Sequence, residues 1–348
     1  MRSRKTIATP PGATIKEQLE DRGMSQKEFA LRMALSEKHI SRLINGDVHL
    51  TPDVAHRLEY VLGIPAQFWN NLEAIYQEKL IQVEEENALD ADEELARKFP
   101  YKEMSDFGWV AATHSIVEKV KNLRAYFEVV RLESLEKLRI PGIAYRRTDA
   151  QSANNYALAA WSQRARIEAR EHEVGNINID KLEKSIPEIR KMTKQDPKEF
   201  FAKLESLLAD CGIALVVLPH MKSSFLHGAT FYDGKKIVMG LTVRGHDADR
   251  FWFSLFHEIG HVLNGHTNKP DGPDDADEAV ADKFSDETLI PMSAFKEYLA
   301  ENEVNDASIR AFAMKIDIDE GIVVGRLQKD RIIGFNMFNQ LKTHYVLE

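Results

Sequence analysis

The chain has 348 residues, of which 43% are hydrophobic and 29% charged, with a formal net charge of −9. This length accommodates two or three domains. No apolar stretch approaches the roughly 20 residues that cross a bilayer, and no apolar run follows the basic N-terminus, so we expect neither a membrane span nor a secretory signal. The single cysteine, Cys211, excludes a disulfide within the chain and favours a cytoplasmic location.

Charge is distributed unevenly along the chain. Residues 1–46 contain nine basic and five acidic side chains, a net charge of +4, whereas acidic side chains dominate residues 84–94 and 271–286. The overall negative charge excludes a uniformly basic, nucleic-acid-binding surface. A short basic segment on an acidic chain is typical of a small DNA-binding module joined to another domain.

Residues 13–76 are predicted to form five short helices separated by capped turns. The second and third are expected over residues 25–33 and 36–44, and each begins with a serine that can cap it. A tight turn at Ala34-Leu35 joins them. Two short helices with this spacing predict a helix-turn-helix.

The exposed face of the third helix is predicted to contact DNA. Lys38 and Arg42 can donate to phosphates or guanine, and Ser41 and Asn45 to phosphates or base edges. Gln26, at the start of the second helix, is placed to meet a phosphate. The full predicted set is Gln26, Ser36, Lys38, His39, Ser41, Arg42 and Asn45. The alternative is a helical domain that does not touch DNA.

Residues 24–76 resemble the lambda-repressor-like domain of HigA-type antitoxins. The pieces SQKEFA, SEKHISRLINGD and GIPAQFWNNLE carry this resemblance. It implies a regulator that binds palindromic operator DNA as a homodimer. A toxin partner follows from the same resemblance.

We predict three parts: an all-α DNA-binding domain over residues 1–80, a helical middle region over residues 81–204 and an α+β domain over residues 205–348. The helical pattern of the middle region is interrupted at Pro141-Gly142. Strand signals begin at residue 213 and include a hairpin around Asp233-Gly234.

An HExxH motif, His257 to His261, lies in a helix predicted over residues 247–264. Residues i and i+4 share a helical face, so both imidazoles can bind one zinc ion. A catalytic zinc needs a third protein ligand, and the next predicted helix, 275–289, offers Glu278. The alternative third ligand is His266, although the three-histidine pattern HExxHxxGxxH would require histidine at position 267.

Two acidic residues complete the predicted site. Glu258 lies beside the ligand face, where it can act as general base and take the proton of a water that the zinc polarises. Asp282 lies one turn after Glu278 on the same helix face and can orient a ligand imidazole through its second ring nitrogen.

The segments RFWFSLFHEIGHVLNG (250–265) and EAVADKFSDETLIP (278–291) resemble the ImmA/IrrE family of zinc peptidases. The resemblance implies a zincin-like metallopeptidase fold, with His257, His261 and Glu278 as zinc ligands and Glu258 as the catalytic acid/base. Ser285 and Ile290 depart from the family's usual alanine and methionine. The strand expected over residues 236–241 is implied to be an edge to which an extended peptide adds. Candidates for stabilising the oxyanion are Tyr298, Arg326 and His344.

Two functional hypotheses of different classes follow. In the first, the protein binds operator DNA and its zinc peptidase domain cleaves a protein partner such as a repressor. In the second, it is a non-enzymatic antitoxin or autorepressor in which the zinc site is structural or sensory. A closed structural site would need a fourth ligand, and His266 is the nearest candidate.

Overall fold

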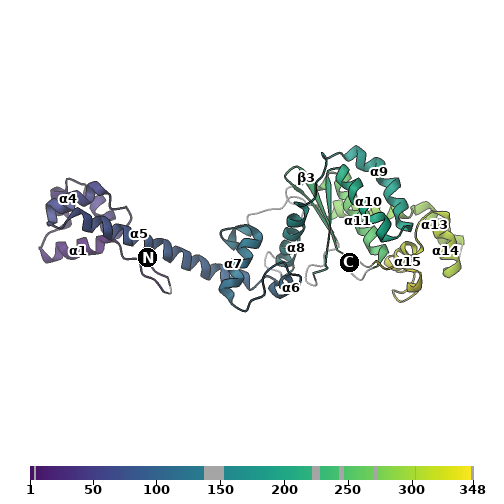
Figure 1. Cartoon of the computed structure of the whole chain (residues 1–348), viewed down its shortest axis with the longest axis horizontal. Helices are drawn as coiled ribbons and strands as arrows, with labels where there is room; N and C mark the ends of the chain where they lie inside the picture. Colours follow the sequence, from purple (N-terminus) through teal and green to yellow (C-terminus); the bar gives the residue numbers. More distant parts are fainter. Residues whose placement is uncertain are drawn as a thin grey trace. The chain divides into compact units, whose positions relative to one another are not determined.

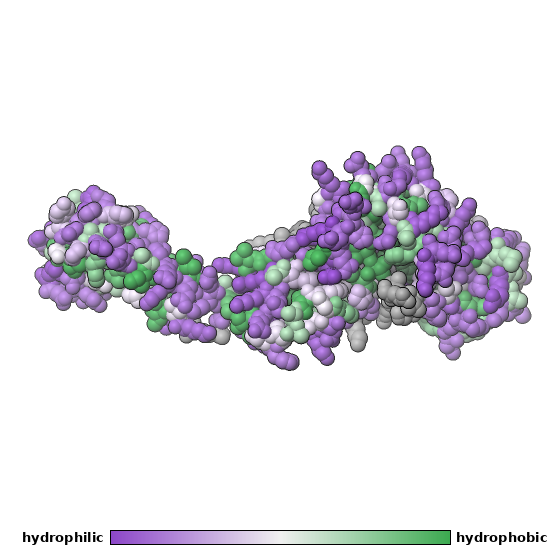
Figure 2. All heavy atoms as spheres, viewed as in Figure 1, coloured by the Kyte–Doolittle hydropathy of each residue, from purple (hydrophilic) through white to green (hydrophobic). Residues whose placement is uncertain are grey.

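The computed structural model describes residues 1–345 except 4, 137–152, 222–227, 243–246, 270–272 and 302. The chain divides into two compact units, Met1–Glu94 and Leu95–Glu348. No helix among the described residues has both the length and the apolar character needed to cross a membrane. On the face seen in Figure 2, hydrophilic residues predominate and apolar residues form small patches between them.

The first unit is all-α. Its buried core is built from apolar residues that recur at helical spacing, among them Ile15, Phe29, Ile40, Leu58 and Trp69. Its helices are α1 (Pro11–Asp21), α2 (Gln26–Met33), α3 (Glu37–Asn45), α4 (Pro52–Leu62) and α5 (Ala66–Ala96).

Serine side chains cap the starts of α2 and α3, as the sequence predicts. The Ser25 hydroxyl accepts a hydrogen bond from the Glu28 N–H at 3.2 Å, and the Ser36 hydroxyl accepts one from the His39 N–H at 3.2 Å. Ala34 takes a left-handed conformation, with φ of 51°, which turns the chain sharply between the two helices. The Glu28 side chain does not close a capping box but accepts two bonds from Arg32.

Helix α5 is longer than the sequence pattern indicates. Residues 66–76 and the acidic stretch that follows form one helix of 31 residues, and the division between the units falls inside it. The first residues of the chain pack on this helix, where Ser3 and Thr6 donate hydrogen bonds to the Glu86 carboxylate. No glycine or proline interrupts residues 66–96, so nothing in the backbone ends the helix early.

The second unit contains a three-stranded sheet surrounded by helices. The strands are β1 (Ile213–Leu218), β2 (Gly228–Asp233) and β3 (Lys236–Thr242). The helices are α6 (Tyr101–Asp106), α7 (Ile116–Phe127), α8 (Ala153–Ala169), α9 (Ile179–Lys191), α10 (Pro197–Asp210), α11 (Ala248–Leu263), α12 (Asp275–Leu289), α13 (Met292–Glu301), α14 (Asp306–Lys315) and α15 (Glu320–Lys329), with short 3-10 turns including η3 (His266–Asn268).

The strand order is β1-β3-β2, with β1 parallel and β2 antiparallel to β3. The expectation that β3 forms an edge is therefore wrong, because β3 is paired on both sides and β2 is an edge of the described sheet. The hairpin is confirmed, but its loop is Gly234-Lys235, since Asp233 pairs with Lys236. Gly234 takes a φ of +63°, which a residue with a side chain adopts only with strain.

Helices cover both faces of the sheet (Figure 1). On one face, Ile237, Met239 and Leu241 pack into the core formed with α10 and α11. On the other, α8 approaches so closely that a Cβ on Gly240 would lie 2.6 Å from the Trp161 ring. Both faces are thus buried, which explains why β1 and β3 are continuously apolar rather than alternating.

The middle of the chain contributes to this core. Leu182 and Ile189 of α9 and Phe200 and Leu204 of α10 are fully buried in the same cluster as the sheet. The structure divides between Glu94 and Leu95. The domain boundaries predicted from the sequence, at residues 80/81 and 204/205, remain predictions. The interruption predicted at Pro141-Gly142 lies outside the described residues.

Arg190 ties α9 to the ends of two other helices. Its guanidinium donates to the carbonyls of Thr288 and Leu289 at the end of α12, at 2.8 and 3.0 Å, and to those of Ile316 and Asp317 after α14, at 2.7 and 3.1 Å. These are carbonyls at helix ends, which have no partner within their own helices.

We expect Arg190→Ala to lower the free energy of unfolding of the second unit by about 2–4 kcal/mol, because half-buried carbonyls lose a charged donor. Urea unfolding followed by tryptophan fluorescence measures this change. Lys184→Ala, an exposed charge on the same helix, is the control and should change stability by less than about 0.5 kcal/mol. Equal effects of the two substitutions would contradict the role assigned to Arg190.

Candidate metal centre and DNA-binding helix

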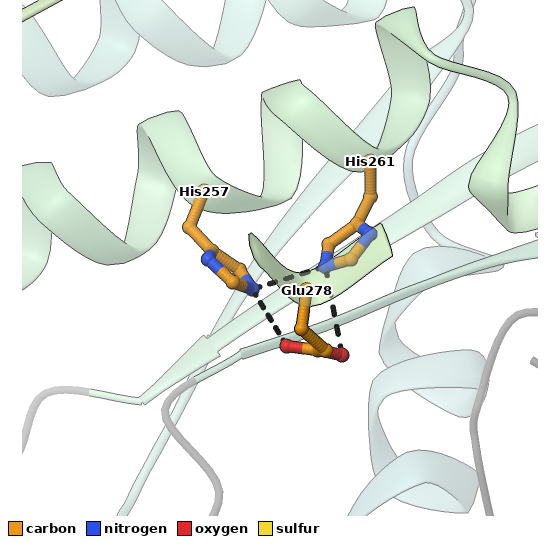
Figure 3. Close-up of side chains that lie close together, drawn as sticks. All are labelled: His257, His261 and Glu278. Carbon is orange, nitrogen blue, oxygen red and sulfur yellow. Dashed lines mark hydrogen bonds and ion pairs between the residues drawn. The ribbon is translucent and has the colours of Figure 1, made fainter. Parts of the chain in front are cut away.

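Helix α11 carries the HExxH motif. Its apolar side, including Trp252, Leu255 and Ile259, is fully buried in the core. His257 and His261 project from the helix one turn apart, on the side that faces α12 (Figure 3). The burial of one face therefore determines where the two imidazoles point.

Gly260, the fourth residue of the motif, allows α12 to approach α11 closely. A Cβ at this position would lie 3.2 Å from the Ala281 Cα and 3.1 Å from the Phe284 ring. Contact between helix backbones requires small residues at the crossing point. This contact brings Glu278, one turn before Ala281, into reach of the two histidines.

The structure brings three possible ligand atoms together (Figure 3). The Nε2 atoms of His257 and His261 are 3.0 Å apart. The Glu278 carboxylate lies 3.3 Å from the His257 Nε2 and 3.8 Å from the His261 Nε2. Tetrahedral zinc with bonds of about 2.0–2.2 Å places its ligand atoms about 3.3–3.6 Å apart. The three observed separations lie within about 0.3 Å of that range, so the three side chains fit a zinc ion with small adjustments.

Hydrogen bonding supports the same conclusion. The His257 Nδ1 lies 2.9 Å from a carboxylate oxygen of Asp282. A carboxylate only accepts, so Nδ1 carries a proton, and once the ring is neutral its Nε2 presents a lone pair. That lone pair faces a second imidazole nitrogen and the Glu278 carboxylate. A cation between them removes the repulsion among the three acceptors.

The pKa values of the two histidines shift in opposite directions. Burial disfavours protonation of His257, but its hydrogen bonds with Asp282 and Glu278 outweigh burial and raise its pKa to about 10. Burial and the neighbouring charge of His257 lower the pKa of His261 well below its usual value. Binding of a metal ion by both imidazoles therefore displaces a proton from His257.

Glu258 is buried between α11 and strand β2. Its side chain accepts a hydrogen bond from the Thr230 hydroxyl at 2.6 Å, and a Cβ on Gly228 would lie 2.7 Å from its Oε1. Burial raises the pKa of Glu258 to about 7, against the opposing effects of His257 and Thr230. A carboxylate with this pKa can both accept and return a proton near neutral pH.

The other residues considered from the sequence lie elsewhere. His266 contacts the far nitrogen of His261, Nδ1 to Nδ1 at 3.0 Å, and is outside the group formed by His257, His261 and Glu278. The three candidates for oxyanion stabilisation have partners of their own: the Tyr298 hydroxyl contacts Ser308, Arg326 pairs with Asp286 and Asp330, and His344 pairs with Asp247.

Three residues with clear roles escaped the sequence reasoning: Gly228, Thr230 and Gly260. Gly228 and Thr230 belong to a hairpin strand that is 28 residues or more distant from Glu258 along the chain, and no periodic pattern links them to it. Gly260 was visible within the motif, and a glycine inside a long helix is itself a signal of close packing.

The predicted DNA-contacting residues gather on α3 and the start of α2. Lys38, Ser41, Arg42 and Asn45 are exposed and recur at intervals of three or four, on one helix face. Gln26 and Ser36 are exposed as well, with the Ser36 hydroxyl engaged as the cap of α3. His39 is half-buried, which leaves it less available than its neighbours.

Two family models match the chain, one within each of its two compact units. A helix-turn-helix family model matches residues 15–69, and the model of the IrrE N-terminal-like domain, a peptidase family, matches residues 218–313. The second match includes β2, β3, α11 and α12, and therefore every residue of the candidate metal centre.

Each of the relatives matches less than a quarter of this chain. The HTH-type transcriptional regulator YddM of Escherichia coli strain K12 is 40% identical over 63 residues, which are 18% of this chain and 67% of that protein. Two solved structures are each 31% identical to this chain, with a TM-score of 0.20. The first, an addiction module antidote protein of the HigA family from Coxiella burnetii, matches over 23% of this chain and 83% of its own. The second, a putative antidote protein of a plasmid maintenance system from Nostoc punctiforme, matches over 22% of this chain and 79% of its own. The chain belongs to the helix-turn-helix regulators and joins to this DNA-binding domain an IrrE N-terminal-like domain.

Proposed function

We propose that this protein is a cytoplasmic transcriptional regulator whose second unit is a zinc-dependent peptidase that hydrolyses a protein partner. One observation carries the proposal. His257, His261 and Glu278 present three acceptor atoms to one point, beside a buried carboxylate, Glu258, that can exchange a proton near neutral pH. A purely structural role of the second unit does not require a buried carboxylate at the position of Glu258.

His257, His261 and Glu278 would hold the zinc. A zinc ion in such a site lowers the pKa of water to about 7 and polarises a carbonyl group. Glu258 takes the proton of the attacking water and returns it to the leaving amine. Thr230 holds the carboxylate in place during both transfers, through the hydrogen bond to Oε2.

Strand β2 offers a surface along which a substrate can lie. It is an edge of the described sheet, and its residues Gly228 and Thr230 border Glu258. An extended peptide that adds to this edge is held by backbone hydrogen bonds, which depend little on its sequence. It passes beside the catalytic carboxylate, as hydrolysis of a backbone amide requires.

The second candidate function is that of an antitoxin without catalytic activity, with a toxin as partner. The likeness of the first unit to antidote proteins favours it. A closed structural zinc site needs a fourth protein ligand. His266 lies behind His261 rather than beside the other ligands, and this supports the catalytic reading of the site.

The first unit is proposed to bind operator DNA as a homodimer through α3. Lys38 and Arg42 supply charge for phosphates or guanine, and Ser41 and Asn45 supply polar contacts to the duplex. Their exposure on one face of α3 supports this assignment.

Metal content is the first test of the proposed peptidase. We expect one zinc per chain in the wild type and in Glu258→Gln, and loss of zinc in Glu278→Ala, because Glu278 supplies one of the three ligand atoms and Glu258 supplies none. On a proteome-derived peptide library analysed by mass spectrometry, zinc-loaded wild type should cleave, and Glu258→Gln should be about 10²–10⁴-fold slower. Stoichiometric zinc without any cleavage would favour the antitoxin, and absence of zinc would reject both forms of the site.

The position of Glu258 gives a second prediction. Gly228→Ala places a methyl group 2.7 Å from the Glu258 Oε1, so the carboxylate must move, and we expect a rate loss on the order of 10²-fold with zinc content unchanged. Gly175→Ala serves as the control, since its Cβ would meet no atom closer than 3.3 Å. An unchanged rate in Gly228→Ala would show that the position of Glu258 does not limit cleavage.

A third prediction concerns DNA. Arg42→Ala and Lys38→Ala should each weaken binding to a duplex from the region upstream of the protein's own gene. Removing one phosphate-binding cation reduces the slope of log affinity against log salt by about 0.9. Fluorescence anisotropy at several salt concentrations measures both quantities. Lys79→Ala removes the same charge from an exposed position on α5, and an equal effect of this variant would reject α3 as the contact surface.

A further inference from the structure

A line of buried polar side chains extends behind His261, away from the candidate metal centre. The His261 Nδ1 lies 3.0 Å from the His266 Nδ1, and the His266 Nε2 lies 3.3 Å from a carboxylate oxygen of Asp277. These three residues are 5, 6 and 8% exposed, respectively. The other Asp277 oxygen is bound by Lys269 and by the Asp274 N–H.

The hydrogen-bonding capacities of these groups determine where the protons lie. The Asp277 carboxylate has no proton to share, so the His266 Nε2 that faces it at 3.3 Å carries a proton. The Nδ1 of a neutral His266 ring is then an acceptor, and the proton between the two rings belongs to the His261 Nδ1. This leaves the His261 Nε2, the atom that faces His257 and Glu278, with a free lone pair.

From this arrangement we infer that His266 and Asp277 are positioning residues that set the tautomer and the ring orientation of His261 for metal binding. The inference rests on the proposed zinc site. His257 is oriented by a carboxylate directly, through Asp282, whereas His261 is oriented by a carboxylate through an intervening imidazole. Partners of this kind raise the basicity of a ligand and fix its orientation.

The position of Asp277 gives this arrangement a second effect. Asp277 immediately precedes the ligand Glu278, and it forms a reciprocal capping box with Asp274 at the start of α12. One carboxylate therefore holds both the helix start that presents Glu278 and the imidazole that orients His261. A histidine buried only for packing would not need a ring nitrogen directed at each of two polar partners.

Zinc affinity of the full-length protein, measured by competition with a chromophoric chelator, tests the inference. His266→Leu removes the acceptor for the His261 proton, and we expect affinity to fall 10–100-fold. In His266→Asn the side-chain oxygen takes the place of Nδ1 as acceptor, and affinity should stay within a factor of about three of the wild type. Thermal unfolding of the metal-free variants verifies that each one folds.

The ring ¹⁵N resonances of the zinc-loaded wild type supply an independent readout that does not depend on a variant folding. We expect the His261 proton on Nδ1 and the metal on Nε2. The inference would be overturned if both variants bound zinc as tightly as the wild type, or if both lost affinity equally. It would also be overturned if the spectra placed the metal on Nδ1. In each of these cases the zinc site itself would stand. A wild type that binds no zinc would overturn the inference and the proposed function together.

Discussion

The contact between α11 and α12 is the constraint on which the candidate metal centre depends. The two histidines come from one helix and the carboxylate from the next, so the three meet only if the helices touch. Gly260 makes this possible, because a side chain there would press against the backbone of α12 at Ala281. The requirement for a helix crossing thus explains a glycine inside the motif, where helix propensity alone disfavours it by about 1 kcal/mol relative to alanine.

The electrostatics of the site follow from burial and from the carboxylates that surround His257. Three carboxylates surround His257: those of Glu258, Glu278 and Asp282. Their negative charges and hydrogen bonds raise the pKa of the His257 ring. Such a cluster binds a proton or a metal ion in preference to remaining empty. Burial opposes protonation of His257 but raises the pKa of Glu258, because a low-dielectric environment favours the uncharged form of each group.

The two units differ in how many elements contribute to their candidate functional sites. The first unit is built mainly from short helices, and most of the residues predicted to contact DNA lie on one of them, α3. The second unit assembles its site from α11, α12 and β2, and supports them with helices from residues that precede the sheet, such as α8 and α10. Under the proposed function, a single molecule combines DNA binding with the cleavage of a protein partner.

Local patterns were sufficient for much of this protein. The i, i+4 spacing of His257 and His261 follows from helix geometry, and the caps at Ser25 and Ser36 depend on neighbouring residues only, so both were readable from the sequence. The order of the strands, the contact of Thr230 and Gly228 with Glu258, and the position of His266 behind His261 were decided by tertiary structure. These features join residues on different elements, and hydrophobic periodicity carries no information about which elements lie side by side. The sequence therefore determined the ligands that a metal could use, and only the packed fold decided how those ligands are oriented.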